Sequence, residues 1–145
     1  MEDYTPYMPW IIMAVNGLIA GWLAGLRDPI VGRALTVLHK RTADRWTLAA
    51  LAERIGASRS VLAERFARLV GQPPMQYLAA WRMQLAARMI GDDGMKVAAA
   101  AREVGYESEA AFSRAFKKLV GVPPATWRAS HWSAPRPSVA LERRR

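Results

Sequence analysis

Small and polar residues recur at matching places in a stretch that the chain contains twice. Residues 58–74 read SRSVLAERFARLVGQPP, and residues 108–124, which lie 50 positions later, read SEAAFSRAFKKLVGVPP. At about 100° per residue of helix, the side opposite the apolar one carries Ser60, Ala63, Glu64 and Ala67 in the first copy and Ala110, Ser113, Arg114 and Lys117 in the second. Such a side suits a helix that inserts into a major groove and touches base edges.

The repeat extends upstream of these two stretches. Residues 48–56 (LAALAERIG) match residues 97–105 (VAAAAREVG) at an offset of 49, so the second copy has one extra residue in its turn. Insertions are tolerated in turns, and the chain is therefore predicted to contain one structural unit twice. Besides Ser58, the residues within 58–74 that recur unchanged 50 positions later are Phe66, Leu69, Val70, Gly71, Pro73 and Pro74.

Each copy is predicted to be a pair of short helices. The first helix of copy one ends at Gly56, which can adopt a left-handed C-cap, and Ser58 can cap the second helix. Gly105 and Ser108 hold these places in copy two. Two helices joined by a short turn with glycine form a helix-turn-helix unit. The predicted buried sides of the second helices are Leu62, Phe66 and Leu69 in copy one and Phe112, Phe116 and Leu119 in copy two.

The pair of units resembles the DNA-binding domain of the AraC/XylS family of bacterial transcription regulators. Residues 105–128 (GYESEAAFSRAFKKLVGVPPATWR) carry the resemblance, with the F-x-x-x-x-G-x-x-P arrangement after the helix-turn-helix, and it covers roughly residues 28–130. It implies an all-α fold of two helix-turn-helix units joined by a long linker helix, about seven helices, plus an N-terminal apolar helix. The implied function is sequence-specific regulation of transcription, with recognition helices 58–70 and 108–120 in adjacent major grooves.

The resemblance also implies which residues contact DNA. Arg114 has the chemistry to bind a guanine bidentately, and Glu64 can accept from a cytosine amino group. Unit one departs from the usual pattern, since Ala63 offers only a methyl and Glu64 repels phosphate. The implied base contacts are Arg59, Ser60, Ala63, Glu64, Glu109, Ala110, Ser113 and Arg114. The implied phosphate contacts are Arg65, Arg68, Arg82, Arg88, Lys117 and Lys118.

Charge and composition agree with a polyanionic partner and disfavour an enzyme. All 21 Lys and Arg residues lie at Arg27 or later, and two of the 12 acidic residues precede it, so the net charge of +9 becomes +11 over residues 27–145. The chain has no cysteine and two histidines, His39 and His131, and lacks G-x-G-x-x-G and Walker patterns. We therefore expect no catalytic site, no cofactor and no metal, and a cytoplasmic protein.

An apolar run at residues 8–26 leaves two interpretations open. Its nineteen uncharged residues are long enough for a membrane-spanning helix, which would make the chain a membrane-tethered regulator. Asn16, Pro9 and three glycines weaken a span and favour a helix that packs against a partner. Residues 21–35 resemble the junction between a cupin-like sensor domain and the DNA-binding domain. The expected domains are an apolar helix at 1–27, the DNA-binding domain at 28–130 and a basic, disordered tail at 131–145.

The connecting helices can also be predicted. Asp28 and Pro29 signal a helix start, and a helix from Ile30 to about Arg41 would bury Val31, Ala34, Leu35 and Leu38. His39 lies near its C-terminus, where the helix dipole favours a cation. Residues 74–90 read as the linker helix, with Tyr77, Leu78, Trp81, Leu85, Met89 and Ile90 available for burial. Trp127 is expected to close the second core in the place that Tyr77 takes in the first.

Double-stranded DNA is the expected partner. RNA polymerase remains open as a further one, as does a second copy or a sensor domain bound through residues 8–26. The competing interpretation is a helical scaffold for protein partners, because duplicated helix pairs also build solenoids. Two copies are few for a solenoid, and the charge favours nucleic acid.

Overall fold

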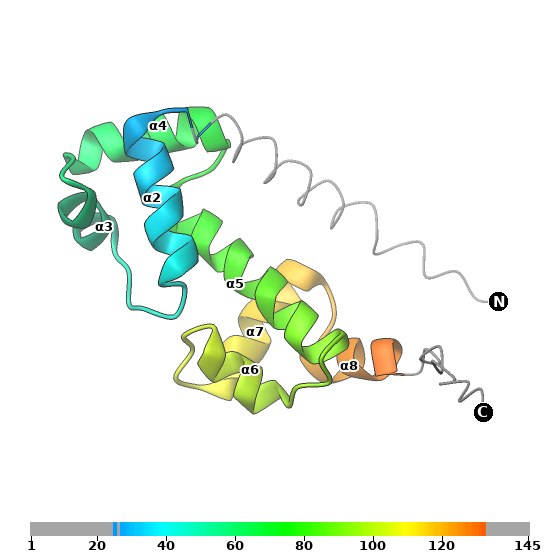
Figure 1. The fold of residues 1–145 in the computed structure, drawn as a ribbon. Coiled ribbons are helices and arrows are strands. Elements are labelled where there is room, and N and C mark those ends of the chain that lie inside the picture. Colours follow the sequence, from blue (N-terminus) through cyan, green and yellow to red (C-terminus); the bar gives the residue numbers. More distant parts are fainter. Residues whose placement is uncertain (1–24, 26, 133–145) are drawn as a thin grey trace, which may run out of the picture.

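Helices make up all the regular structure in the described part of the chain (Figure 1). The computed structural model describes residues 25 and 27–132. The order confirms two helix-turn-helix units, α3–α4 and α6–α7, joined by one long helix. In chain order the helices are α2 (Pro29–Lys40), α3 (Leu48–Ile55), α4 (Arg59–Val70), α5 (Pro74–Gly91), α6 (Val97–Glu103), α7 (Glu109–Val120) and α8 (Pro124–Trp132).

Two predicted segments fall outside the described residues. They are the apolar N-terminal helix, of which only Gly25 and Arg27 are described, and the tail from residue 133 onward. The tail was predicted to begin at His131, but His131 and Trp132 belong to α8. Among the helices that the structure describes, none combines the length and the apolar character needed to cross a bilayer.

The two predicted recognition helices begin at equivalent serine caps. The hydroxyl oxygen of Ser58 accepts the backbone N–H of Val61 at 3.2 Å, and that of Ser108 accepts the N–H of Ala111 at 3.3 Å. A cap of this kind satisfies one of the donors that the first turn of a helix leaves without an intrahelical partner. Both caps were predicted, and the structure confirms them.

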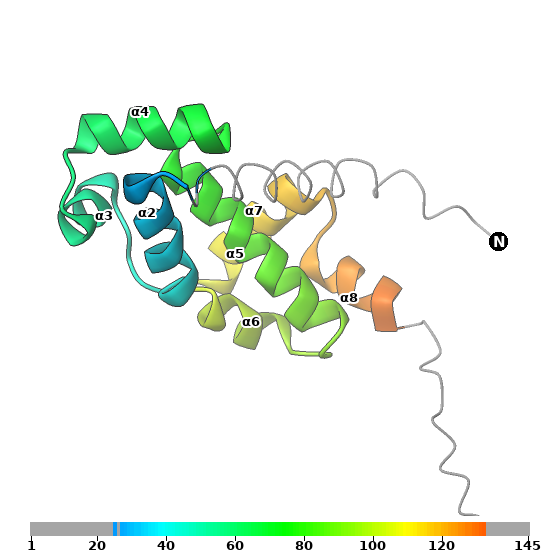
Figure 2. The ribbon, with the colours of Figure 1, turned by 45° about the horizontal axis from the view of Figure 1, so that its top comes forward.

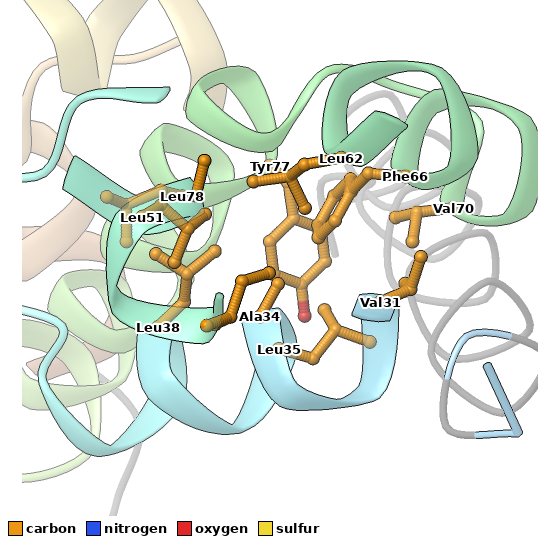
Figure 3. Close-up of a cluster of buried hydrophobic side chains, with 12 residues drawn as sticks. Val31, Ala34, Leu35, Leu38, Leu51, Leu62, Phe66, Val70, Tyr77 and Leu78 are labelled. Atoms are coloured by element: carbon orange, nitrogen blue, oxygen red, sulfur yellow. The ribbon is translucent and has the colours of Figure 1, made fainter. Parts of the chain in front are cut away.

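Helices α2, α3 and α4 enclose a first buried cluster with the start of α5 (Figure 3). The four residues predicted to face inward from α2 are all fully buried: Val31, Ala34, Leu35 and Leu38. Tyr77 of α5 projects between α2 and α4, and its ring meets that of Phe66 edge-on at 5.6 Å between centroids. Leu69, predicted to be buried, is half-buried and packs against this cluster, while Val70 is buried.

A second buried cluster lies between α6, α7, α8 and the C-terminal part of α5. Phe112 and Phe116 of α7 are fully buried, with ring centroids 5.6 Å apart. Trp127 of α8 lies 6.3 Å from the ring of Phe116 and donates its indole N–H to the carbonyl oxygen of Ala87 at 2.9 Å. Trp127 therefore fastens α8 to α5, which confirms that it closes the second core.

Helix α5 serves both clusters and runs between the two units in both ribbon views (Figures 1 and 2). Three residues predicted to be available for burial, Trp81, Leu85 and Met89, are only half-buried. A single apolar stripe is a poor guide here because the neighbours of α5 change along its length. The buried residues are Tyr77 and Leu78 in the first cluster and Met83, Ala86 and Ile90 in the second.

His39 lies in an aromatic stack between α2 and α5. Its ring is 4.3 Å from that of Trp81, and its Nε2 is 2.6 Å from the hydroxyl oxygen of Tyr77. Burial lowers the pKa of His39 below its ordinary value of 6.5, because desolvation disfavours the charged form. The expectation that this position favours a cation is therefore wrong. The same burial raises the pKa of Tyr77 to about 12.

This half-buried histidine should make stability depend on pH. An unfolded chain protonates His39 near pH 6.5, about its ordinary pKa, whereas the folded chain resists protonation. The contribution of His39 to the free energy of unfolding should therefore be complete above this pH. It should be lost as the pH drops from there toward the lowered pKa of the folded state. Urea unfolding at several pH values, compared with His39→Gln, measures the effect. If the free energy of unfolding depended on pH in the same way in both proteins, the prediction would be wrong.

Candidate nucleic-acid interface

The outward side of α4 is open to solvent at three of its four predicted base-reading positions. Arg59, Ser60 and Glu64 are exposed, and Ala63 is half-buried. Val61, next to them, is 36% exposed, and an apolar side chain of this kind can contact a thymine methyl. Val61 was not among the predicted base contacts, which were all small or polar residues. Its apolar character on an otherwise polar side was the available signal.

The outward side of α7 repeats this arrangement. Three predicted base-reading residues, Glu109, Ala110 and Arg114, are exposed, and Ser113 is half-buried. Opposite them, the inner side of the same helix buries Phe116 in the second cluster. Packing of the apolar side thus turns the Arg114 side outward. Lys117 and Lys118 are also exposed, in the last turn of this helix.

Two predicted DNA contacts on α4 pair with each other. The guanidinium of Arg68 lies 3.5 Å from the carboxylate of Glu64, one helical turn away, and the two side chains are 63% and 70% exposed. Exposed pairs at this spacing contribute only about 0.3–0.5 kcal/mol. Arg68 can therefore exchange Glu64 for a DNA phosphate at small cost. While paired, it offsets part of the negative charge by which Glu64 would repel DNA phosphates.

Arg65, a third predicted contact on α4, reaches the start of α2. Its guanidinium donates to the carboxylate of Asp28 at 3.3 Å, and that carboxylate caps α2 by accepting the N–H groups of Ile30 and Val31 at 2.9 and 3.0 Å. The hydrogen bond from Val31 is the main reason that the pKa of Asp28 is lowered, with Ile30 and Arg65 adding to it against burial. Arg65 therefore ties α4 to α2, whatever it contributes at a phosphate.

Arg82 differs from the other predicted phosphate contacts because it is half-buried. Its guanidinium donates to the carbonyl oxygens of Thr42 at 2.9 Å and Asp44 at 2.7 Å, and it lies 6.0 Å from the centre of the Tyr106 ring. Burial lowers the pKa of Arg82, while Tyr106 and Asp44 oppose this shift. Its hydrogen bonds thus connect α5 to the loop between α2 and α3. Arg88, by contrast, is exposed on α5.

Comparisons with known proteins identify the family and the fold. A helix-turn-helix domain family model matches residues 51–130. A predicted AraC-like transcription regulator of Streptomyces lividans is 50% identical over 110 residues, which are 76% of this chain and 36% of that protein. This chain thus spans about a third of that curated relative.

Two solved structures have the same fold. The C-terminal domain of AraT, a response regulator from Geobacillus stearothermophilus, has a TM-score of 0.68 at 31% identity over 71% of this chain and 86% of that one. The DNA-binding domain of AdpA, a global transcriptional factor solved with a target DNA, has a TM-score of 0.66 at 27% identity over 71% and 92%. The chain belongs to the AraC-type helix-turn-helix family of DNA-binding transcription regulators.

Proposed function

We propose that this chain is the DNA-binding part of a transcription regulator and inserts α4 and α7 into adjacent major grooves. The observation that carries the proposal is the two-sidedness of both helices. Each buries its phenylalanine side in a separate cluster and turns its small and polar side to solvent. Proteins that read base edges from a helix need such an exposed, uncrowded side.

The linker helix supports the spacing that this mode requires. Helix α5 has 18 residues, which at 1.5 Å each span about 27 Å. Successive major grooves on one side of a duplex are about 34 Å apart. Since α4 and α7 belong to the units at the two ends of α5, this helix and the width of the units can supply the separation.

The roles of individual residues follow their chemistry. Arg114 would bind a guanine through two hydrogen bonds, and Glu64 would accept from a cytosine amino group. We add Val61 as an apolar contact for a thymine methyl. The remaining base-reading positions are Arg59, Ser60, Ala63, Glu109, Ala110 and Ser113, and the phosphate contacts are Arg65, Arg68, Arg88, Lys117 and Lys118.

Wider properties of the regulator belong to the same proposal. A protein that acts on a bacterial chromosome works in the cytoplasm, where that DNA lies. Activation of a promoter would require a contact with RNA polymerase. Since the chain spans 36% of the Streptomyces lividans relative, the proposal includes a sensor domain or a second copy that binds through residues 8–26.

Salt-dependent DNA binding tests the proposal. With the five phosphate contacts named above, affinity for duplex DNA should fall roughly 500-fold between about 50 mM and about 200 mM salt, because each neutralised phosphate releases counterions. Gel retardation at several salt concentrations measures this, and selection from a random DNA pool should yield one preferred sequence with two half-sites. A helical scaffold for protein partners would retard no duplex in a salt-dependent way and select no sequence.

A further inference from the structure

The two helix-turn-helix units have separate hydrophobic cores. The first cluster draws on α2, α3, α4 and the start of α5, and the second on α6, α7, α8 and the later part of α5. Apolar packing fixes each recognition helix within its own unit. The angle between the units must therefore be set by α5 and by whatever contacts connect them.

Arg82 lies on α5 between the parts that serve the two clusters, and it contacts both units. On one side its guanidinium donates to the carbonyl oxygens of Thr42 and Asp44, in the loop between α2 and α3. On the other it faces the ring of Tyr106, in the turn between α6 and α7, at 6.0 Å. A guanidinium is planar, carries donors in a fixed fork and attracts an aromatic face, so one side chain can make all three contacts.

The loop and the turn also meet directly. A Cβ added to Gly105 would lie 2.4 Å from the carbonyl oxygen of Ala43, so the two backbones approach as closely as only glycine allows. Gly105 has φ +91°, which glycine adopts without strain. Beside this contact Arg45 of the loop forms an ion pair with Glu107 of the turn. The contacts named here between the loop and the turn are thus made by polar groups and backbone.

We propose that Arg82 is a positioning residue that locks loop 42–45 against turn 105–107 and so fixes the spacing and angle between α4 and α7 before DNA is bound. The proposal rests on the proposed function, in which these two helices read adjacent half-sites. If the two units are held in a fixed arrangement, binding of the second helix to its half-site costs no conformational entropy for orienting the units. Removing the clamp should weaken the coupling between half-sites while leaving each recognition helix intact.

Two substitutions of Arg82 separate this role from a phosphate contact. Arg82→Met removes the donors and keeps an unbranched apolar stem. Arg82→Lys keeps the charge but lacks the planar fork that spans two carbonyl oxygens. The matched control is Arg102→Met, which removes one charge from an exposed site on α6. Each protein is measured on the selected operator, on a duplex with one half-site, and on operators whose half-sites are moved apart by a base pair.

We expect Arg82→Met and Arg82→Lys to bind the single half-site as the unaltered protein does. Both should lose roughly tenfold or more of the preference for the complete operator, and both should tolerate the altered spacing better. Arg102→Met should keep the full preference. If Arg82→Lys behaves like the unaltered protein while Arg82→Met weakens all duplexes alike, Arg82 is a phosphate contact and the proposal is wrong. Unchanged coupling in both variants also overturns it.

A measurement without DNA tests the clamp independently. The chain has no cysteine, so Glu53→Cys and Glu103→Cys, at exposed sites on α3 and α6, can carry one spin label each. The distribution of distances between the two labels should be narrow in the protein with Arg82 and broader in Arg82→Met. If Arg82→Met no longer melts cooperatively, Arg82→Lys takes its place in this comparison. Equal widths would overturn the clamp. If the protein selects no operator but the widths differ, the proposed function fails and the clamp stands.

Discussion

Replacing Phe116 with alanine is expected to lower the free energy of unfolding by about 3–5 kcal/mol, the range for truncating a buried aromatic residue. Phe116 is fully buried on α7, and its ring lies against those of Phe112 and Trp127. The cavity would open where α5, α7 and α8 meet. Urea unfolding followed by circular dichroism measures the loss.

The equivalent residue of the first unit provides the matched comparison. Phe66 is also fully buried but belongs to the other cluster, so Phe66→Ala should destabilise the protein to a similar extent. The two losses should be close to additive because the residues share no cluster. Val61→Ala, at an exposed site on α4, should change stability little. A loss below about 1 kcal/mol for Phe116→Ala would show that the second cluster is not packed as described.

Replacing Arg114 with alanine is expected to weaken binding to the selected operator by about 1–3 kcal/mol and to relax the preference at one base pair. Arg114 is exposed on α7, on the side opposite Phe116, so its removal leaves the core unchanged. Affinities for operators carrying each of the four base pairs at every position, measured by competition, locate the relaxed base.

Lys117→Ala supplies the control for this substitution. Lys117 is exposed in the last turn of α7 and is assigned to a phosphate. Its loss should weaken all sequences alike and lower the slope of log affinity against log salt by about one. If Arg114→Ala leaves affinity and base preference untouched, the outward side of α7 has been assigned wrongly.

Features set by neighbouring residues could be predicted from the sequence. Ser58 and Ser108 cap α4 and α7 as expected, and the inner side of α2 is buried as its spacing indicated. These features depend on local hydrogen bonds and on helical periodicity. The repeat predicted two equivalent units in the chain. Residues 74–90, the long segment between the two helix pairs with many apolar residues, predicted the helix that joins them.

Contacts between distant residues could not be predicted in this way. Arg82 is a basic residue in a chain expected to bind DNA, so the sequence indicated a phosphate contact. Its carbonyl partners, Thr42 and Asp44, lie about 40 positions away and became visible only in three dimensions. The prediction that His39 favours a cation was wrong for a related reason. The dipole of its own helix is a local effect, whereas the rings of Tyr77 and Trp81 that partly bury it come from α5.

The separation of the two sides of α7 has a consequence for how such a protein changes over generations. The exposed residues Glu109, Ala110 and Arg114 belong to neither buried cluster. Mutations there can therefore accumulate without eroding the scaffold, since surface substitutions usually shift stability by less than about 0.5 kcal/mol. Under the proposed function, a lineage can thus acquire control of a different promoter through a few substitutions on this side, while Phe112 and Phe116 stay fixed.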